Sequence, residues 1–492
     1  MSPKKKKRSI RQLADKKKKE MTKKKKSVSV REPRIIKNEK YIPHLLRGMR
    51  DILPVDRIYW DFVNNRAKAI AAVYGFERIE TPTIEDYNLF ERGTGMTSEV
   101  VEKQMYDFID KGGGHICCRP EGTPSVVRAY IEHGMFNLPQ PLKLYYYGSM
   151  FRHEKPQAGR LRQLHQFGVE VIGSEKPIID AQVIMLSRAF CESLGLNPII
   201  EVNSIGCSVC RKVYRRKLTD YFKFRRKQLC SDCQRRLEIN PLRILDCKEK
   251  ECQELSKKIP QIIDYLCVDC HNHFTRVLEY LDEAGASYEL NYRVVRGLDY
   301  YTRTVFEVFV SRPQIESQLQ PLLSVIEEKE QEKIESKTAI AAPIQDGQRL
   351  AIGGGGRYDN LVEILGGKPT PACGVAFGLD RIVEELKIQN IKLPKARGPQ
   401  VFIAQLGDMA RQKALKIFEV LRKDGFRIAE NFSKDSLRAQ LETAHRLGTK
   451  LCLIIGHQEV LNNTIIIRDM LSGSQEIVDQ DKIAKELHKK IK

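Results

Sequence analysis

Long apolar runs are absent from this sequence of 492 residues, although 41% of its residues are hydrophobic and 30% are charged. Because no stretch of about 18 apolar residues occurs, we expect no membrane-spanning helix. The basic N-terminal residues are not followed by an apolar stretch, so we expect no secretory signal. The thirteen cysteines are therefore expected to be reduced thiols or metal ligands of a cytoplasmic protein, rather than disulfides of a secreted one.

The sequence also has fewer acidic than basic residues. The chain has 84 Lys and Arg against 63 Asp and Glu, a formal net charge of +21. Residues 1–40 carry a net charge of +14 and residues 203–276 carry +8, so the rest of the chain is nearly neutral. We interpret the first segment as a disordered Lys-rich extension, which would either add affinity for any polyanion or be a solvated tail without a dedicated role.

The order of strand and helix patterns predicts an α+β fold with a separate C-terminal domain. The length allows two to four domains. Strand-like segments follow one another within residues 41–395, which is an antiparallel pattern. A Cys-rich insertion (203–276) and a polar insertion (311–349) interrupt that pattern. Residues 400–492 alternate strand and helix patterns instead, so we expect an α/β domain there.

Local patterns predict individual elements. Apolar spacing predicts helices over residues 55–74, 322–335, 358–366, 379–387, 408–424, 434–447 and 480–491. Composition and turn signals predict strands over residues 76–84, 105–109, 115–119, 142–151, 166–172, 288–295, 302–310, 373–377, 401–405, 426–429, 451–455 and 464–467. Gly353–Gly356 lacks the Gly-Lys-Ser/Thr ending of a phosphate-binding loop, so we interpret it as a turn in which backbones approach closely.

Three arginines and two glutamates are candidate site residues. A guanidinium is the natural partner of a phosphate, which makes Arg152, Arg296 and Arg381 candidates for binding one. Taken singly, each is more often a surface or salt-bridged residue. Glu121 and Glu170 fall in the same half of the chain as Arg152. They would receive an amino or imidazolium group, or else form ordinary ion pairs.

Five segments in one order resemble a known family. Gly48–Pro54 with Pro82, Phe151–Gly168 and Gly374–Arg381 resemble the three motifs of class II aminoacyl-tRNA synthetases. Arg119–Thr123 and Arg296–Tyr301 resemble signatures of histidyl-tRNA synthetases. The resemblance covers about residues 42–310 and 350–490. It implies a class II synthetase core, with an antiparallel sheet flanked by helices, an anticodon-binding domain over 400–492 and a homodimer.

The resemblance also implies a reaction and a set of roles. Histidine would be activated with ATP to histidyl-adenylate and pyrophosphate, and then transferred to the 3′ end of tRNA(His). Arg152 and Arg296 would be the catalytic residues at the α-phosphate, Arg381 would hold the γ-phosphate, and Mg²⁺ would neutralise the β- and γ-phosphates. Glu154 would also contact ATP, and Gln157 and Arg160 the tRNA acceptor end. The implied histidine-binding residues are Glu121, Gly122, Thr123, Arg152, Gln166, Glu170, Arg296, Tyr300 and Tyr301.

Four cysteine pairs fall in the Cys-rich insertion: Cys207/Cys210, Cys230/Cys233, Cys247/Cys252 and Cys267/Cys270. Two Cys-x-x-Cys pairs about 20 residues apart match the spacing of a zinc ribbon. Cys207, Cys210, Cys230 and Cys233 are therefore the predicted ligands of a structural Zn²⁺, and the eight thiols would hold one or two ions. The alternative is a helical insertion whose cysteines are small buried residues.

Two other functions are compatible with parts of the sequence. A non-enzymatic relative, such as the regulatory subunit of ATP phosphoribosyltransferase or a tRNA-sensing domain, would tend to lose the phosphate-binding arginines or the anticodon domain, and both are present here. A zinc-dependent nucleic-acid-binding protein would explain the Lys-rich extension and the cysteine pairs. It leaves the ordered pocket signatures unexplained.

Overall fold

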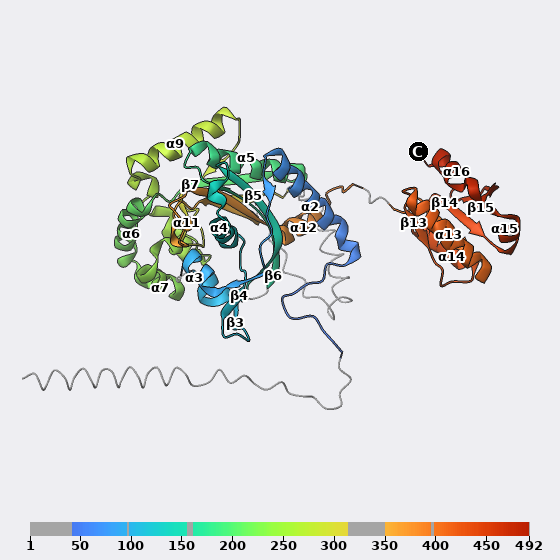
Figure 1. The fold of residues 1–492 in the computed structure, drawn as a ribbon. Coiled ribbons are helices and arrows are strands. Elements are labelled where there is room, and N and C mark those ends of the chain that lie inside the picture. The colour runs from blue at the N-terminus through green and yellow to red at the C-terminus, as the bar shows by residue number, and fades with distance from the viewer. Residues whose placement is uncertain (1–41, 96–97, 155–160, 313–349, 395–397, 492) are drawn as a thin grey trace, which may run out of the picture. The chain divides into compact units, whose positions relative to one another are not determined.

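The computed structural model describes residues 42–95, 98–154, 161–312, 350–394 and 398–491 (Figure 1). The Lys-rich extension, the helix predicted over 322–335, Gln157 and Arg160 lie outside the described residues. The chain divides into the units Met1–Arg50 and Asp51–Lys492. The described end of the first unit contains a turn, in which Gly48 has a φ of 82° and the amide of Met49 donates to the carbonyl oxygen of Leu46 at 3.0 Å.

An eight-stranded, mostly antiparallel sheet forms the centre of residues 51–394. Neighbouring strands are antiparallel except for two parallel pairs, β1 with β5 and β7 with β8. The predicted antiparallel α+β core is therefore confirmed. In spatial order the strands are β1 (Glu77–Arg78), β5 (Leu142–Phe151), β6 (Gln163–Ile172), β11 (Ala372–Gly378), β10 (Leu350–Arg357), β9 (Thr302–Val310), β7 (Pro198–Ser204) and β8 (Glu289–Leu290).

Side chains alternate between the two faces of this sheet, as strand geometry requires. On strand β5, Tyr145 belongs to one hydrophobic core and its neighbours Leu144 and Tyr146 belong to the other. Four long helices pack in the first core (Figure 1): α2 (Pro54–Val73), α5 (Pro177–Ser193), α9 (Val268–Glu283) and α12 (Leu379–Ile388). The second core includes α4 (Thr123–Glu132), α11 (Leu361–Ile364) and the cysteine-rich helices.

A smaller three-stranded sheet has the order β2 (Ile84–Asp86), β4 (His115–Cys118) and β3 (Tyr106–Ile109). The hairpin predicted around Gly112–Gly114 is confirmed, because β3 and β4 are antiparallel neighbours. The single strand predicted over residues 76–84 is wrong: β1 and β2 belong to different sheets, and Pro82 lies between them. The short elements nearby are α3 (Tyr87–Thr94), η1 (Val100–Gln104) and η2 (Met135–Asn137).

The turn predicted at Gly353–Gly356 is wrong, because these glycines form the middle of strand β10. This central strand pairs with β9 on one side and β11 on the other. A Cβ atom on Gly355 would lie 2.1 Å from the carbonyl oxygen of Gly374, so the two backbones approach too closely for a side chain. The close approach inferred from the glycines is present, but it occurs within a sheet.

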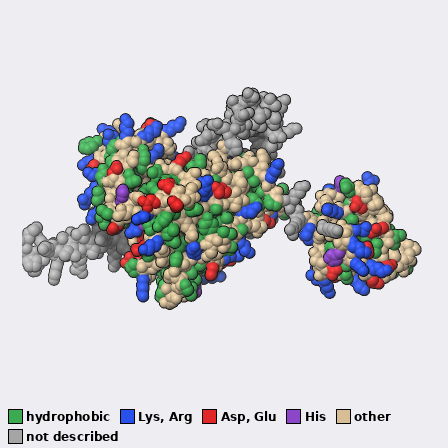
Figure 2. Space-filling view, turned by 90° about the horizontal axis from the view of Figure 1, so that it is seen from above, with side chains coloured by type: hydrophobic (Ala, Val, Ile, Leu, Met, Phe, Trp, Pro, Cys, Tyr) green, Lys and Arg blue, Asp and Glu red, His purple; other side chains and the backbone are tan. Residues whose placement is uncertain are grey.

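The Cys-rich segment is helical. Its longer helices are α6 (Ser208–Lys223), α7 (Ser231–Ile239), α8 (Lys250–Leu255) and the start of α9. Short 3₁₀ turns join them: η3 (Arg226–Gln228), η4 (Pro241–Ile244), η5 (Ser256–Lys258) and η6 (Ile262–Tyr265). Figure 2 shows many Lys and Arg side chains at the left of the view, the side on which Figure 1 places α6 and α7, which agrees with the local charge of +8.

The C-terminal part forms a five-stranded sheet with helices on both faces, confirming the predicted α/β fold. Its strands, in spatial order, are β13 (Ile428–Glu430), β12 (Val401–Gln405), β14 (Leu451–Ile455), β15 (Thr464–Asp469) and β16 (Gln475–Asp479). Its helices are α13 (Asp408–Lys423), α14 (Leu437–Arg446), α15 (His457–Asn462) and α16 (Ile483–Lys490), preceded by η7 (Gln480–Lys482). The sequence patterns missed α15 and β16. Among the described helices of the whole chain, none combines the length and hydrophobicity needed to cross a bilayer.

Candidate active site

A cavity of about 280 Å³ lies on the large sheet and collects side chains from widely separated parts of the sequence. Gly122 is not among its lining residues; it precedes helix α4, and a Cβ there would lie 2.2 Å from the ring of Tyr146. Ten of the predicted site residues do line it: Glu121, Thr123, Arg152, Glu154, Gln166, Glu170, Arg296, Tyr300, Tyr301 and Arg381.

Each of the three arginines donates a hydrogen bond to an oxygen of the protein. Arg152 donates from Nε to the carbonyl oxygen of Pro120 at 2.9 Å, and Arg381 donates from Nη1 to that of Ala351 at 2.7 Å. Arg296 donates from Nη1 to Oε1 of Glu307 at 2.5 Å. A guanidinium has five donors in a planar fork, and this geometry suits an anion with several oxygens.

Glu121 and Glu170 are buried beside each other in the wall of the cavity. Tyr300 donates its hydroxyl to Oε2 of Glu121 at 2.8 Å, and Thr123 donates to Oε1 of Glu170 at 2.7 Å. The hydroxyl of Tyr358 donates to the other oxygen of Glu170. These bonds orient both carboxylates.

Two buried acceptor atoms in the cavity have no hydrogen-bond partner among the described residues: Oε1 of Glu121 and Oε1 of Gln166. A buried polar atom without a partner costs free energy unless a ligand or water supplies one. A ligand with N–H donors, such as an ammonium group, would satisfy both acceptors.

Burial disfavours the ionised form of the two glutamates. It raises the pKa of Glu121 to about 7, against the opposing effects of the Tyr300 hydrogen bond and the charges of Arg152 and Arg296. It raises the pKa of Glu170 to about 8, although the hydrogen bonds from Tyr358 and Thr123 favour the carboxylate. The site therefore contains two carboxyl groups that a cationic or N–H-donating ligand would ionise near neutral pH.

Among the lining residues that were not predicted from the sequence, two bind predicted site residues through their side chains. Tyr358 binds Glu170, and Glu307 binds Arg296. Tyr358 follows the glycine run in the sequence, and that position was the only signal for it. Glu307 lies in the middle of a strand with no motif around it, so nothing in the sequence distinguished it from an exposed glutamate.

Glycines make room for two of the charged groups. A Cβ atom on Gly354 would lie 2.4 Å from Nη1 of Arg296, and one on Gly374 would lie 1.9 Å from Oε2 of Glu170. Both distances are shorter than any normal contact. The glycines of β10 and β11 therefore let the side chains of the cavity lie flat against the sheet.

Eight of the thirteen cysteines form two sets of four, and their grouping differs from the prediction. Cys207 and Cys210 lie with Cys267 and Cys270, whereas Cys230 and Cys233 lie with Cys247 and Cys252. In each set the sulfur atoms all lie within 4.8 Å of one another. Placing Cys207, Cys210, Cys230 and Cys233 in one set was wrong, because sequence spacing favours adjacent pairs while the fold brings the first pair to the last.

Comparisons with known proteins agree with this geometry. Residues 48–215 match the family described as "Histidyl-tRNA synthetase", and residues 400–490 match "Anticodon binding domain". The "Histidine--tRNA ligase" of Desulforamulus reducens is 43% identical over 88% of this chain and 96% of its own length. The protein of that name from Dehalococcoides mccartyi is 42% identical over 90% and 99%. The structure of apo S. aureus histidyl-tRNA synthetase, 33% identical, covers 91% of this chain and 100% of its own with a TM-score of 0.71. The chain therefore belongs to the histidyl-tRNA synthetase family and is a ligase of the aminoacyl-tRNA synthetase class.

Proposed function

We propose that this chain activates L-histidine with ATP and transfers it to tRNA(His), with the cavity described above as its active site. The observation that carries this proposal is the convergence of three arginines with two buried glutamates on one cavity. The arginines suit a triphosphate, and the glutamates suit a small molecule that carries an ammonium group and an imidazole.

Arg152 and Arg296 are the proposed catalytic residues and would bind the α-phosphate of ATP, while Arg381 would bind the γ-phosphate. A carboxylate oxygen of histidine attacks the α-phosphorus, a new O–P bond forms, and the bond to the leaving pyrophosphate breaks. The attacking oxygen is already ionised, so the step needs no general base. Its barrier is lowered by cationic groups that hold both anions together and stabilise the redistributed charge.

Histidine would occupy the end of the cavity nearest the glutamates. Its ammonium group fits the unpartnered acceptors of Glu121 and Gln166. Glu170 and Tyr301 would bind the two imidazole nitrogens, one as acceptor and one as donor, because neutral imidazole has one N–H and one bare nitrogen. A pocket with such paired partners rejects amino acids that leave them unsatisfied. Gly122, Thr123 and Tyr300 complete the proposed set.

Mg²⁺ and Zn²⁺ are the proposed metal ions. The carboxylates of Glu154 and Glu307 line the same cavity as the arginines. Such residues fit Mg²⁺, which binds through one or two carboxylates together with substrate phosphates and would neutralise their charge. The cysteine sets fit a structural Zn²⁺, because thiolates are the ligands that this ion prefers in closed sites.

The remaining parts of the proposal concern tRNA, assembly and location. Gln157 and Arg160 would contact the acceptor end, and the domain within residues 400–492 would bind anticodon bases by stacking and edge contacts. A homodimer follows from the resemblance of Gly48–Pro54 to motif 1. None of the thirteen cysteines, all of which lie in the described ranges, forms a disulfide, which suits the cytoplasm.

Histidine-dependent exchange of labelled pyrophosphate into ATP tests the first step directly. We expect exchange with histidine and none with other amino acids at the same concentration. Charging of tRNA(His) tests the second step. A well-folded protein that shows no exchange would contradict the enzymatic function and favour a non-catalytic relative of the family.

A further inference from the structure

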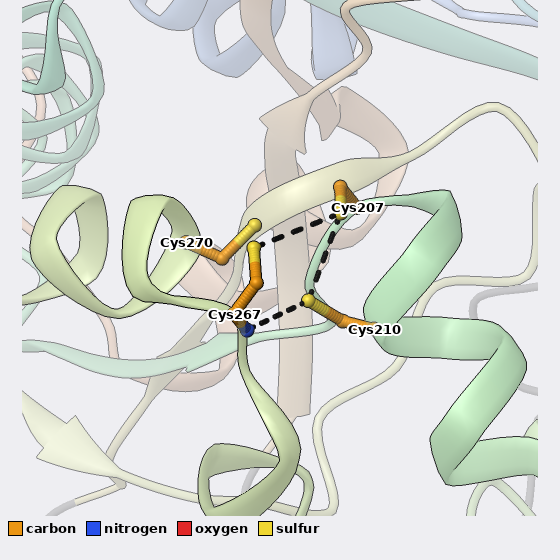
Figure 3. Close-up of side chains that lie close together, drawn as sticks. All are labelled: Cys207, Cys210, Cys267 and Cys270. Atoms are coloured by element: carbon orange, nitrogen blue, oxygen red, sulfur yellow. Dashed lines mark hydrogen bonds between the residues drawn. The ribbon is translucent and has the colours of Figure 1, made fainter.

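The two cysteine sets have the geometry of closed tetrahedral metal sites. Four thiolates at about 2.3 Å from one Zn²⁺ place their sulfurs about 3.8 Å apart. The sulfur of Cys207 lies 3.6 Å from that of Cys210 and 4.0 Å from that of Cys267 (Figure 3). The sulfurs of Cys230 and Cys247 are 3.8 Å apart. A disulfide would require about 2 Å, so these spacings suit a shared ion and not a sulfur–sulfur bond.

Backbone amides point at several of these sulfurs. The amide of Cys267 donates to Sγ of Cys210 at 3.1 Å, and that of Cys230 donates to Sγ of Cys252 at 3.4 Å. The amide of Cys233 donates to Sγ of Cys230, also at 3.4 Å. Hydrogen bonds to sulfur favour the thiolate, which is the form that binds metal. Both sets therefore have the right donors, the right spacing and an outer layer of N–H groups.

Each set is linked to the loop that carries the histidine signature. Arg211, one residue after Cys210, donates from Nη1 to the carbonyl oxygen of Tyr301 at 2.9 Å. Arg243, between Cys233 and Cys247 in the sequence, donates from Nη1 to the carbonyl oxygen of Gly297 at 2.6 Å. Asn240 adds a 3.2 Å bond from Nδ2 to Oδ1 of Asp299. The segment Arg296–Tyr301 is thus held from the cysteine-rich side at both of its ends.

We infer that the insertion binds two separate Zn²⁺ ions, one in each cysteine set. The second ion, held by the set that contains Cys230 and Cys247, keeps Arg243 against Gly297 as a positioning residue for the amino-acid pocket. The reason is mechanical. Helix α7, which carries Cys233, and turn η4, which carries Arg243, lie between Cys230 and Cys247. A small insertion holds such elements in place only weakly without an ion. The metal sites stand on their own geometry, whereas the role of Arg243 in histidine binding rests on the proposed function.

Metal analysis of the full-length protein, purified without added zinc, tests the two sites. We expect two equivalents of zinc per chain, and X-ray absorption showing four sulfur ligands per ion at about 2.3 Å. The paired variants Cys207→Ser/Cys267→Ser and Cys230→Ser/Cys247→Ser should each lose one equivalent. Cys452→Ala, which alters a thiol of the C-terminal domain, should retain both.

One equivalent or fewer in the wild-type protein, or a mixture of nitrogen and sulfur ligands, would overturn the two-site assignment. Both measurements are made on the wild-type protein, so they test the assignment even if the cysteine variants fail to fold.

Arg243→Ala tests the positioning role. We expect KM for histidine in the exchange assay to rise about tenfold, as for the loss of a charged donor to a carbonyl, while the zinc content stays at two equivalents. Arg243→Lys keeps a donor for the carbonyl oxygen of Gly297, so its KM for histidine should stay close to that of the wild type. Arg235→Ala is the matched control, because Arg235 contacts Glu102 at 3.2 Å on the surface.

An unchanged KM for Arg243→Ala would overturn the positioning role, as would an equal change for Arg235→Ala. The effects of Arg243→Ala and of Cys230→Ser/Cys247→Ser should also fail to add, because both release the same loop. Additive effects would show that the second ion acts elsewhere. Wild-type exchange is measured alongside, so failure of the proposed function is distinguishable from failure of this inference.

Discussion

The hydroxyl of Thr123 lies 2.7 Å from Oε1 of Glu170 and donates a hydrogen bond to it. Thr123 begins helix α4, whereas Glu170 lies on strand β6, so this bond joins two elements across 47 residues of sequence. With Tyr358 bound to its second oxygen, Glu170 is oriented from two sides. The carboxyl group of Glu170 is therefore positioned to accept a hydrogen bond from a ligand in the cavity.

Histidine binding should weaken as the pH falls from 8 to 7. The pKa of Glu170 is raised to about 8 and that of Glu121 to about 7. Binding of N–H donors requires the carboxylates, so below these values each group must first release a proton. The dissociation constant should therefore rise about tenfold over this pH unit. Isothermal titration calorimetry in buffers of different ionisation enthalpy measures both the affinity and the proton release.

Glu170→Gln should remove most of this pH dependence as well as weakening binding, since a glutamine has no proton to release. Glu192→Gln, on the surface and paired with Arg188, should leave it unchanged. A pH-independent affinity in the wild-type protein would contradict ionisation of the two glutamates on binding.

Arg296→Ala should lower the rate of pyrophosphate exchange about a thousandfold, as expected for the loss of one donor that stabilises a transition-state charge. Thermal stability should change little, because burial raises the pKa of Glu307, its partner, and this carboxyl can take up a proton when left alone. Arg188→Ala on the surface is the control. A large drop in the melting temperature would instead indicate a structural role for Arg296.

Gly354→Ala should impair catalysis without unfolding the protein. The new Cβ would lie 2.4 Å from Nη1 of Arg296, which is the flexible end of a side chain and would move away. We expect exchange to fall at least tenfold, with a melting temperature close to that of the wild type. Gly398→Ala, where the nearest atom is 3.6 Å away, is the matched control. Full activity of Gly354→Ala would show that Arg296 does not need its observed position.

Asp180→Asn should destabilise the fold rather than the chemistry. Asp180 is fully buried and accepts hydrogen bonds from Nε of Arg357 at 2.8 Å and from Oγ1 of Thr304 at 2.7 Å. Neutralising Asp180 leaves the buried guanidinium of Arg357 with less compensating negative charge. The free energy of unfolding should therefore fall by about 3–5 kcal/mol. Urea unfolding measures the change. Asp479→Asn, in an exposed pair with Lys482, should cost less than about 0.5 kcal/mol; equal effects would contradict the importance of burial.

Deletion of residues 1–40 should weaken tRNA binding mainly at low salt. This segment carries a net charge of +14, and cationic chains bind polyanions by releasing counterions. The slope of log Kd against log salt concentration should therefore become shallower. If the slope is the same with and without residues 1–40, this segment has no role in tRNA binding.

Local features of the fold could be predicted from the sequence because they depend on neighbouring residues. Strands Leu142–Phe151, Thr302–Val310, Val401–Gln405 and Leu451–Ile455 have the predicted bounds, since apolar runs and turn residues mark them directly. The strand predicted over residues 288–295 shrinks to β8, Glu289–Leu290. Beyond those two residues the chain turns back to place Tyr300 and Tyr301 in the cavity, and no local pattern signals such a turn.

The sequence by itself determined which residue types are available: arginines in recognisable motifs, the glutamates Glu121 and Glu170, and eight paired thiols. Only the tertiary structure decided which of them meet. Cys207 joins Cys267, 60 residues away, rather than the nearer Cys230. The glycine run pairs as a central strand because β9 and β11 lie beside it. The physical reason is that side-chain periodicity reports only which face is buried, whereas contacts across a sheet depend on strand order.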